Sequence, residues 1–99
     1  LYLIGGKTEN TYLNSVYVYY PGDPFDPDDD EWDRTSNMPG PAVENAAAVT
    51  FDDEIYVFGG STGSFSGAVD NAAVFDPLFS SWRSLPGSPT ARSGATAQV

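Results

Sequence analysis

The sequence predicts an all-β protein of short antiparallel strands, and three observations support this fold class. Ten Gly and eight Pro stand among short runs rich in Val, Ile, Tyr and Phe, a composition typical of strands joined by turns. The longest apolar runs, 1–4 and 55–58, both end at a Gly pair and are shorter than a typical helix. The third observation is an internal repeat, which predicts how the strands are arranged.

Two halves of the chain carry the same landmarks in the same order. The landmarks, each followed by its counterpart, are Gly5-Gly6 and Gly59-Gly60, Tyr20-Pro21 and Asp76-Pro77, Trp32 and Trp82, Met38-Pro39 and Leu85-Pro86, and residues 45–47 and 94–96. Their offsets are 54, 56, 50, 47 and 49 residues. A period that drifts by a few residues is what loops of different length produce between strands of fixed length.

This repeat resembles the kelch repeat over essentially the whole chain. The kelch pattern is an apolar stretch ending in Gly-Gly, a strand end like Tyr-Asp-Pro, a Trp, and then Met-Pro or Leu-Pro, and all of these occur here twice. The resemblance implies a β-propeller with blades of four antiparallel strands, named a to d from the channel outward. Kelch rings most often have six blades, so the chain is expected to be a two-blade fragment of a six-bladed propeller.

The strands are expected in the order b, c, d, then a, b, c, d, then a. Strand b is predicted at 1–5 and 55–59, c at 14–20 and 71–76, d at 31–36 and 81–85, and a at 45–51 and 93–99. Residues 51–54 predict a hairpin turn between strands a and b. The chain therefore divides into a first repeat at 1–44 that lacks its inner strand, a complete second repeat at 45–92, and, at 93–99, the inner strand of a following blade.

Two residue types are expected to have structural roles. Gly adopts positive φ and lets another backbone approach closely, which suits the sharp exits from strand b at Gly5, Gly6, Gly59 and Gly60. Trp32 and Trp82, on strand d of each repeat, are expected to pack between blades. The six Tyr residues are interpreted as strand and inter-blade packing, because no partner for radical or acid-base chemistry accompanies them.

Composition argues against several classes of function. The chain has no Cys and no His, which removes Ser-His-Asp and Cys-His nucleophilic machinery and the usual zinc, copper and non-haem iron ligands. A net charge of −10 with four basic residues argues against a nucleic-acid partner, since such surfaces are positive. No apolar run approaches the length of a membrane helix, so membrane insertion is not expected.

An acidic insertion separates strands c and d of the first repeat. Eleven residues separate Pro21 from Trp32 against five in the second copy. Asp26, Asp28 and Asp30 have the alternating spacing with which calcium loops direct carboxylates at one ion, so Ca²⁺ is the one cofactor considered. An EF-hand loop would require Gly at 31 and Glu at 37, where the chain has Glu31 and Asn37, and a solvated charged loop is the alternative interpretation.

Three polar residues precede the two predicted inner strands. The resemblance implies that Arg92 stands at the position where kelch repeats commonly carry an Arg facing the channel mouth. There its planar guanidinium is suited to acidic groups of a partner, the alternative being an inter-blade salt bridge or a bond to loop carbonyls. Val43 replaces it in the first copy, followed by Glu44 and Asn45, which are either channel-mouth contacts or ordinary loop residues.

The loop at 61–68 supplies a further candidate. It is small and polar except for Phe65 at its centre, and kelch loops between strands b and c help to shape the binding face. An aromatic side chain at such a tip is either a contact residue or folds back over the blade. Phe65 is therefore a candidate binding residue.

The function expected from the sequence is a noncatalytic module that binds a protein or glycan ligand through loops at one end of the channel. The first alternative is a fragment of a kelch-fold enzyme, of the oxidase or sugar epimerase type, whose catalytic residues lie in other blades. The second is a calcium-stabilised surface or adhesion propeller. The chain itself is expected not to be an enzyme, because no residue set in it matches a catalytic one.

The expected partners follow from the strand order. The first repeat lacks an inner strand, while the segment 93–99 is an inner strand without a blade. The remaining blades of the same propeller complete both, or further copies of this chain do so, with three copies giving six blades.

Overall fold

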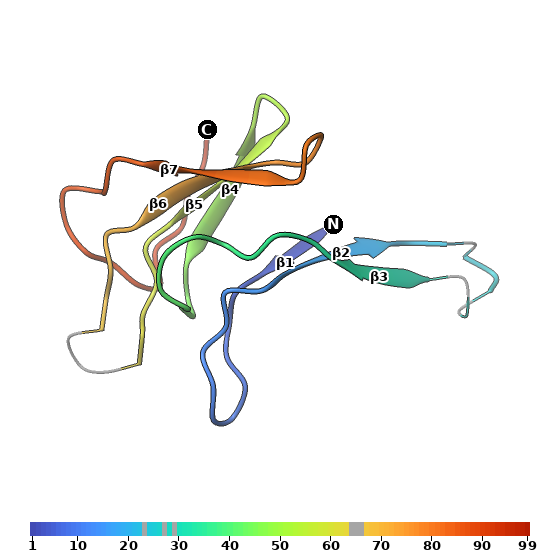
Figure 1. The fold of residues 1–99 in the computed structure, drawn as a ribbon, viewed down its shortest axis with the longest axis horizontal. Helices are drawn as coiled ribbons and strands as arrows, with labels where there is room; N and C mark the ends of the chain where they lie inside the picture. Colours follow the sequence, from blue (N-terminus) through green and yellow to red (C-terminus); the bar gives the residue numbers. More distant parts are fainter. Residues whose placement is uncertain (23, 27, 29, 64–66) are drawn as a thin grey trace.

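Seven strands form two antiparallel sheets in the computed structural model, which describes residues 1–22, 24–26, 28, 30–63 and 67–99. The first sheet, blade one, has the order β1 (Tyr2–Ile4), β2 (Val16–Tyr20) and β3 (Glu31–Arg34). The second, blade two, has the order β4 (Ala47–Phe51), β5 (Glu54–Phe58), β6 (Ala72–Asp76) and β7 (Ser81–Leu85). Figure 1 shows the two sheets side by side, joined by the segment after β3.

These strands confirm the predicted order b, c, d, a, b, c, d, with ends that differ by no more than two residues. The turn at 51–54 is also confirmed, because Phe51 pairs with Glu54 and the two residues between them have positive φ, 52° at Asp52 and 63° at Asp53. This is the geometry of a two-residue hairpin turn, whose backbone twist matches that of the strands it joins.

The segment 93–99 forms no strand in the structure. A strand needs a ladder partner, and the partner expected here is strand b of a following blade. The assignment of 93–99 as an inner strand therefore stays a prediction.

Blade two buries both of its faces at β6, as expected for a strand enclosed between blades. Ala72, Ala73, Val74 and Phe75 are all buried. Successive side chains of a strand point to opposite faces, so an unbroken buried run means that both faces are covered. Within the described residues no helix is long and apolar enough to cross a bilayer.

The hydrophobic core lies between the two blades. Its buried members are Val16, Met38 and Val43 from blade one and the segment that follows it, and Ile55, Val57 and Phe75 from blade two. Tyr2 reaches across from β1, and its ring meets that of Phe75 edge-on at a centroid distance of 5.5 Å. Because this cluster draws its members from both blades, each blade stabilises the other.

The two tryptophans occupy matching strand positions but different surroundings. Trp82 packs on Phe75 at 5.0 Å and donates from Nε1 to the carbonyl of Ser36, in the segment after β3, at 3.0 Å. Trp32 packs on Tyr19 of its own blade at 4.9 Å and is 54% exposed. The contact equivalent to that of Trp82 would be with a blade preceding blade one, so the expectation that Trp32 packs between blades stays a prediction.

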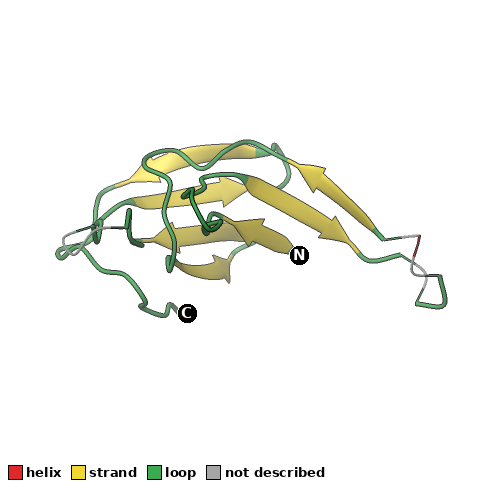
Figure 2. Cartoon of the chain, turned by 90° about the horizontal axis from the view of Figure 1, so that it is seen from below, coloured by secondary structure: helices red, strands yellow, loops and turns green. Residues whose placement is uncertain are grey.

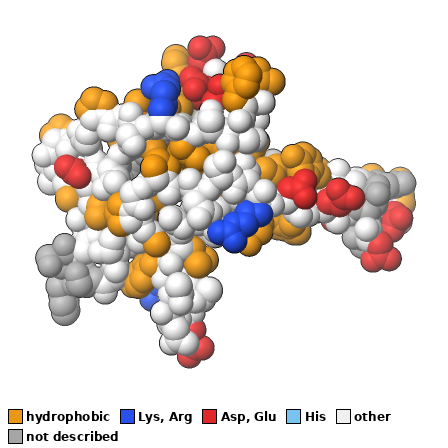
Figure 3. All heavy atoms as spheres, in the orientation of Figure 1, with side chains coloured by type: hydrophobic (Ala, Val, Ile, Leu, Met, Phe, Trp, Pro, Cys, Tyr) orange, Lys and Arg blue, Asp and Glu red, His pale blue; other side chains and the backbone are white. Residues whose placement is uncertain are grey.

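Blade one projects outward as an arm at the end where β2 and β3 are joined by the c–d connection. Figure 2 shows this arm projecting beyond the stacked strands, and Figure 3 shows acidic side chains gathered near its tip. The radius of gyration is 14.3 Å, compared with about 13 Å for a compact domain of this length. The arm and the two open blade faces account for the more extended shape.

We expect Trp82→Ala to lower the free energy of unfolding by about 3 kcal/mol, because it opens a cavity against Phe75 and removes the bond to Ser36. Trp32→Ala is the matched control and should cost much less, since Trp32 is half-exposed. Urea denaturation followed by circular dichroism measures both. Equal losses for the two variants would contradict the inter-blade role of Trp82.

Candidate functional site

The end of the blades at which both Gly pairs lie, here called the glycine end, has the same main-chain hydrogen bonds in each blade. In blade one, Gly6 N donates to Val43 O at 2.8 Å, Leu13 N to Gly6 O at 2.9 Å, and Val43 N to Leu13 O at 3.2 Å. In blade two, Gly60 N donates to Arg92 O at 2.7 Å, Val69 N to Gly60 O at 3.0 Å, and Arg92 N to Val69 O at 3.0 Å. Val43 and Arg92 are therefore equivalent positions, as the sequence alignment predicted.

Glycine is required where these bonds form. Gly59 has a φ of 68°, and a Cβ atom there would lie 2.4 Å from the carbonyl oxygen of Arg92. Gly60 has a φ of 110°, and its Cβ would lie 2.8 Å from that of Val43. A side chain at either position would displace the segment that carries Arg92 or Val43.

Arg92 has a fixed main chain and an exposed side chain. The other three basic residues all have contacts: Lys7 with the Tyr12 ring at 5.5 Å, Arg34 with Asn37 at 3.0 Å, and Arg83 with Glu54 at 3.7 Å. Within the described residues, the guanidinium of Arg92 has no hydrogen-bond, ion-pair or ring partner. With the residues that the structure describes, the Arg92 side chain forms neither an inter-blade salt bridge nor a bond to a loop carbonyl.

The structure places Glu44 and Asn45 at the same end. Glu44 exchanges two main-chain hydrogen bonds with Ser61, at 3.0 and 2.8 Å, and its residue is half-buried. Asn45 is exposed, has a φ of 57°, and accepts a hydrogen bond from Gly94 N at 2.8 Å. This last bond ties the start of β4 to the segment that follows Arg92.

A shallow hollow of about 200 Å³ lies beside Arg92. Its lining includes Ala47, Phe58 and Gly59 and the polar residues Ser88, Arg92 and Thr96. Ser61, Ser88 and Thr96 were not identified from the sequence. The signal available for Ser61 was its alignment with Lys7 in the first copy, since both follow a Gly pair.

The b–c loops of the two blades touch at the glycine end. A Cβ atom on Gly63 would lie 2.2 Å from the hydroxyl oxygen of Tyr12, so the Tyr12 ring rests against the main chain of Gly63. Phe65, predicted as a binding residue in the same loop, lies outside the described residues. Its role stays a prediction.

In the acidic arm, the residues predicted as calcium ligands take part in hydrogen bonds within the chain. Asp30 accepts hydrogen bonds from the Tyr19 hydroxyl at 2.5 Å and from Gly22 N at 2.8 Å, and Asp26 accepts one from Asp28 N at 3.1 Å. Among the described residues, no three acidic side chains gather as a set of metal ligands. Binding of Ca²⁺ by Asp26, Asp28 and Asp30 is an untested prediction.

The pKa values at the arm follow from this bonding. The hydrogen bond from Tyr19, followed by that from Gly22, lowers the pKa of Asp30 below its usual value of 3.8. The same bond to Asp30 raises the pKa of Tyr19, with smaller contributions from desolvation and from the charge of Asp30. Both shifts stabilise the pair as a neutral phenol and a carboxylate.

Comparison with known protein families agrees with this geometry. A family model described as the kelch motif matches residues 44–89, which span the whole of blade two. The chain is built from kelch repeats. Blade one repeats the hydrogen bonds of the matched kelch blade, and the predicted kelch β-propeller fold is confirmed.

Curated relatives of the kelch chain include an F-box protein and a sugar epimerase. An F-box/kelch-repeat protein of Arabidopsis thaliana is 34% identical over 86 residues, which are 86% of this chain and 23% of that protein. An N-acetylneuraminate epimerase of Yersinia pestis is 33% identical over 93 residues, covering 82% of this chain and 23% of the enzyme. The chain thus spans less than a quarter of the length of these relatives.

A solved structure supports the fold over nearly the whole chain. The structure of YjhT superposes with a TM-score of 0.69 at 21% identity, covering 97% of this chain and 30% of YjhT. At this level of identity the likeness shows the fold alone.

We expect Gly59→Ala to destabilise the protein more than Gly94→Ala, by at least about 1 kcal/mol. Both residues have positive φ, which costs an L-residue roughly 1–2 kcal/mol, but only at Gly59 does the new Cβ also meet a carbonyl oxygen. Thermal unfolding of the two variants measures the difference. Equal melting temperatures would show that the close approach to Arg92 is absent in solution.

We expect Tyr19→Phe to raise the pKa of Asp30 toward its ordinary value, because the variant lacks the hydroxyl donor. A carboxylate with a lowered pKa stabilises the fold above its unfolded pKa, and this stabilisation disappears as pH falls through the folded pKa. The variant should lose it at a higher pH than the parent. Carboxyl titration by NMR measures the shift, Tyr20→Phe is the control, and an unchanged Asp30 titration in Tyr19→Phe would contradict the bond.

Proposed function

We propose that the chain is a noncatalytic binding module that takes a protein or glycan ligand at the glycine end of its blades. The observation that carries this proposal is Arg92. Two main-chain hydrogen bonds fix its Cα, at 2.7 and 3.0 Å, while its exposed guanidinium has no partner within the described part of the chain. A fixed main chain loses no further freedom on binding, and a guanidinium without a partner has no internal contact to give up when it meets a ligand.

The distribution of charge supports the glycine end as the ligand-binding end. Among the described residues, acidic side chains concentrate at the opposite end, at Asp26, Asp28, Asp30, Glu31 and Asp33, in the segment 52–54 and at Asp76. The glycine end carries Lys7 and Arg92 with Glu9, Glu44 and Asp70. A ligand with a carboxylate would be repelled from the first end and would meet a guanidinium at the second.

The side chains around Arg92 favour a polar ligand group of small size. The planar fork of Arg pairs with a carboxylate through two parallel hydrogen bonds. Ser88, whose hydroxyl donates to Thr90 O at 2.8 Å, and Thr96 line a hollow of about 200 Å³, enough for one side chain or one sugar substituent but not for a whole drug-sized ligand. Glu44 and Asn45 would contact the parts of the ligand that lie outside the hollow.

A second candidate function is favoured by the relatives. Proteins described as N-acetylneuraminate epimerases match 82% of this chain at 33% identity. In this alternative the two blades belong to a sugar epimerase, Arg92 holds the acidic sugar, and the ionisable groups that exchange protons come from other blades. Binding of an acidic sugar without epimerisation by the two blades alone fits both candidates.

The binding proposal is tested with the full 99-residue chain on arrays of acidic peptides and of glycans that include N-acetylneuraminate. We expect Arg92→Ala to weaken the binding of any selected ligand tenfold to hundredfold, since a hydrogen bond to a charged group contributes about 1.5–3 kcal/mol. Arg83→Ala is the control, because Arg83 forms an exposed pair with Glu54. Equal weakening in both variants would mean that net charge, and not Arg92, determines binding.

The enzyme alternative needs a different measurement. Proton NMR of N-acetylneuraminate, incubated with the full-length protein, shows whether one epimer converts into the other. Conversion that Arg92→Ala abolishes would replace the noncatalytic proposal with the epimerase one. Ligand binding without conversion supports the noncatalytic module.

A further inference from the structure

A groove of about 570 Å³, here called the inter-blade groove, lies between the outer strands of the two blades. Its residues in blade one include Tyr20 on β2 and Asp33 on β3, and its residues in blade two include Pro77 and Ser80 in the β6–β7 turn. Ser36, in the segment after β3, links the two walls, because its hydroxyl donates to Ser80 O at 2.8 Å. The groove is therefore built by two adjacent blades and is separate from the glycine end.

The Asp33 side chain lies on the face of blade one that meets blade two. Asp33 is paired with Val18, and Val18 with Tyr2, so these three side chains share one face of the sheet. On that face, the Tyr2 ring contacts the ring of Phe75 in blade two at 5.5 Å. Asp33 is exposed, and among the described residues its carboxylate has no hydrogen-bond or ion-pair partner. The groove thus contains a carboxylate that is available to a ligand.

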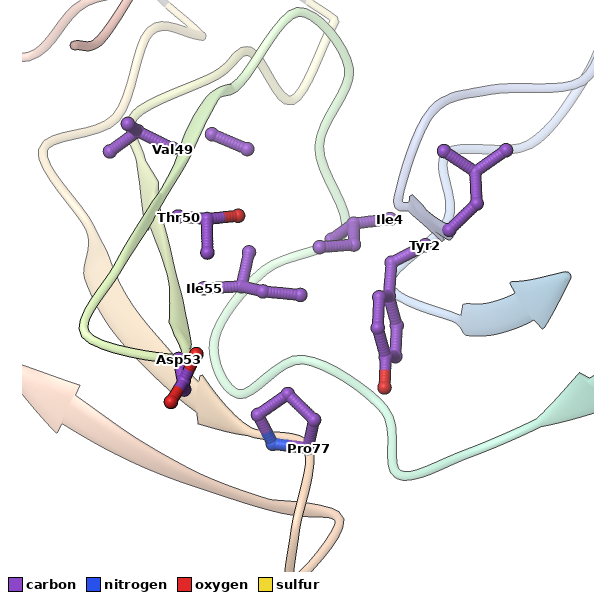
Figure 4. Close-up of a pocket in the computed structure, with 9 residues that line it drawn as sticks. Tyr2, Ile4, Val49, Thr50, Asp53, Ile55 and Pro77 are labelled. Atoms are coloured by element: carbon purple, nitrogen blue, oxygen red, sulfur yellow. The ribbon is translucent and has the colours of Figure 1, made fainter. Parts of the chain in front are cut away.

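Hydroxyl groups line the same groove. Figure 4 shows the Tyr2 side chain reaching from β1 to the side of Pro77. Burial, and then electrostatic interaction with Tyr20, raises the pKa of Tyr2 above its usual value of 10.0, so Tyr2 is uncharged at neutral pH. In the part of the chain that the structure describes, neither phenol has a hydrogen-bond partner. Thr35 adds a buried hydroxyl oxygen that also lacks one, and buried groups of this kind are normally paired by water or a ligand.

The charge around the groove favours a cationic ligand. Arg34 also lines the groove, but its guanidinium donates to Asn37 at 3.0 Å, and Arg83 pairs with Glu54 at 3.7 Å. An anion would be repelled by the negative potential of this end, and a neutral sugar would gain nothing from it. The other acidic residues at this end of the two sheets include Glu31, Asp52, Asp53 and Asp76.

We propose that the inter-blade groove binds a basic segment of a partner protein through an Arg side chain. The planar guanidinium would donate two parallel hydrogen bonds to the Asp33 carboxylate. Guanidinium groups also stack on aromatic rings, so the same side chain would lie against Tyr20, with its methylene stem facing Pro77. This site differs from the glycine end in sign as well as in place, because there Arg92 offers a cation to an acidic ligand.

Fluorescence anisotropy tests the proposal, with the full 99-residue chain titrated into a labelled peptide of three arginines between glycines. We expect Asp33→Asn to weaken binding about tenfold, since it removes the charge and keeps the shape. Asp52→Asn is the matched control, because it makes the same change of charge outside the groove, at a φ of 52° that Asn adopts readily. A peptide with citrulline in place of arginine has nearly the same shape without the charge and should bind at least tenfold more weakly than the arginine peptide.

The two tryptophans report where the peptide binds. Trp82 Nε1 donates to the carbonyl of Ser36, a residue that lines the groove, whereas Trp32 packs on Tyr19 on the opposite face of blade one. Binding in the groove should shift the indole N–H signal of Trp82 and leave that of Trp32 unchanged. Proton–nitrogen NMR of the full chain measures both signals, and the dispersion of the spectrum establishes that Asp33→Asn and Asp52→Asn are folded.

The opposite results overturn the proposal. Absence of binding, equal weakening by Asp33→Asn and Asp52→Asn, or equal binding of the arginine and citrulline peptides would show that Asp33 does not hold a guanidinium. A Trp82 shift produced by the neutral disaccharide maltose, but not by the arginine peptide, would make the groove a sugar site. Arg92→Ala should leave binding of the arginine peptide unchanged, and its loss in that variant would place the peptide at the glycine end.

Discussion

The structure depends on apolar contact between blades. The sheets carry apolar side chains on both faces, and burial of such surface, at about 25 cal/mol per Å², is the main force that holds them together. The contact of Tyr2, Val16 and Met38 with Ile55 and Phe75 is the place where this occurs within the chain. Trp82 makes the contact directional, because its indole N–H donates a hydrogen bond to one carbonyl oxygen, that of Ser36 in the segment after blade one.

The glycine end depends on the same stacking of blades. Val43 is 2% exposed and is both part of the inter-blade core and the acceptor for Gly6. The packing that joins the blades therefore also sets the loops that precede β4. In blade two, the equivalent segment holds Arg92 at the glycine end with its residue exposed.

The sequence predicts the strands well because each short apolar run ends at a strong signal, a Gly pair, a Pro or the Asp52-Asp53 turn. It predicts the equivalence of Val43 and Arg92 from the repeat alone. It cannot predict that Trp32 is exposed while Trp82 is covered, because the two have the same local pattern and differ only in which face meets another blade. Nor can it show that Arg92 lacks a partner among the described residues or that Ser88 and Thr96 lie beside it, since these depend on how distant loops come together.

Val43 and Arg92 occupy the same place in two blades, one as a buried apolar residue and the other as an exposed cation. Hydrogen bonds between peptide groups define that place, and every residue except Pro can supply them. The main-chain shape of a blade therefore does not depend on which side chains stand at such positions. Divergence to 21% identity with YjhT at a TM-score of 0.69 fits such an arrangement, in which evolution can change each displayed residue without rebuilding the loop beneath it.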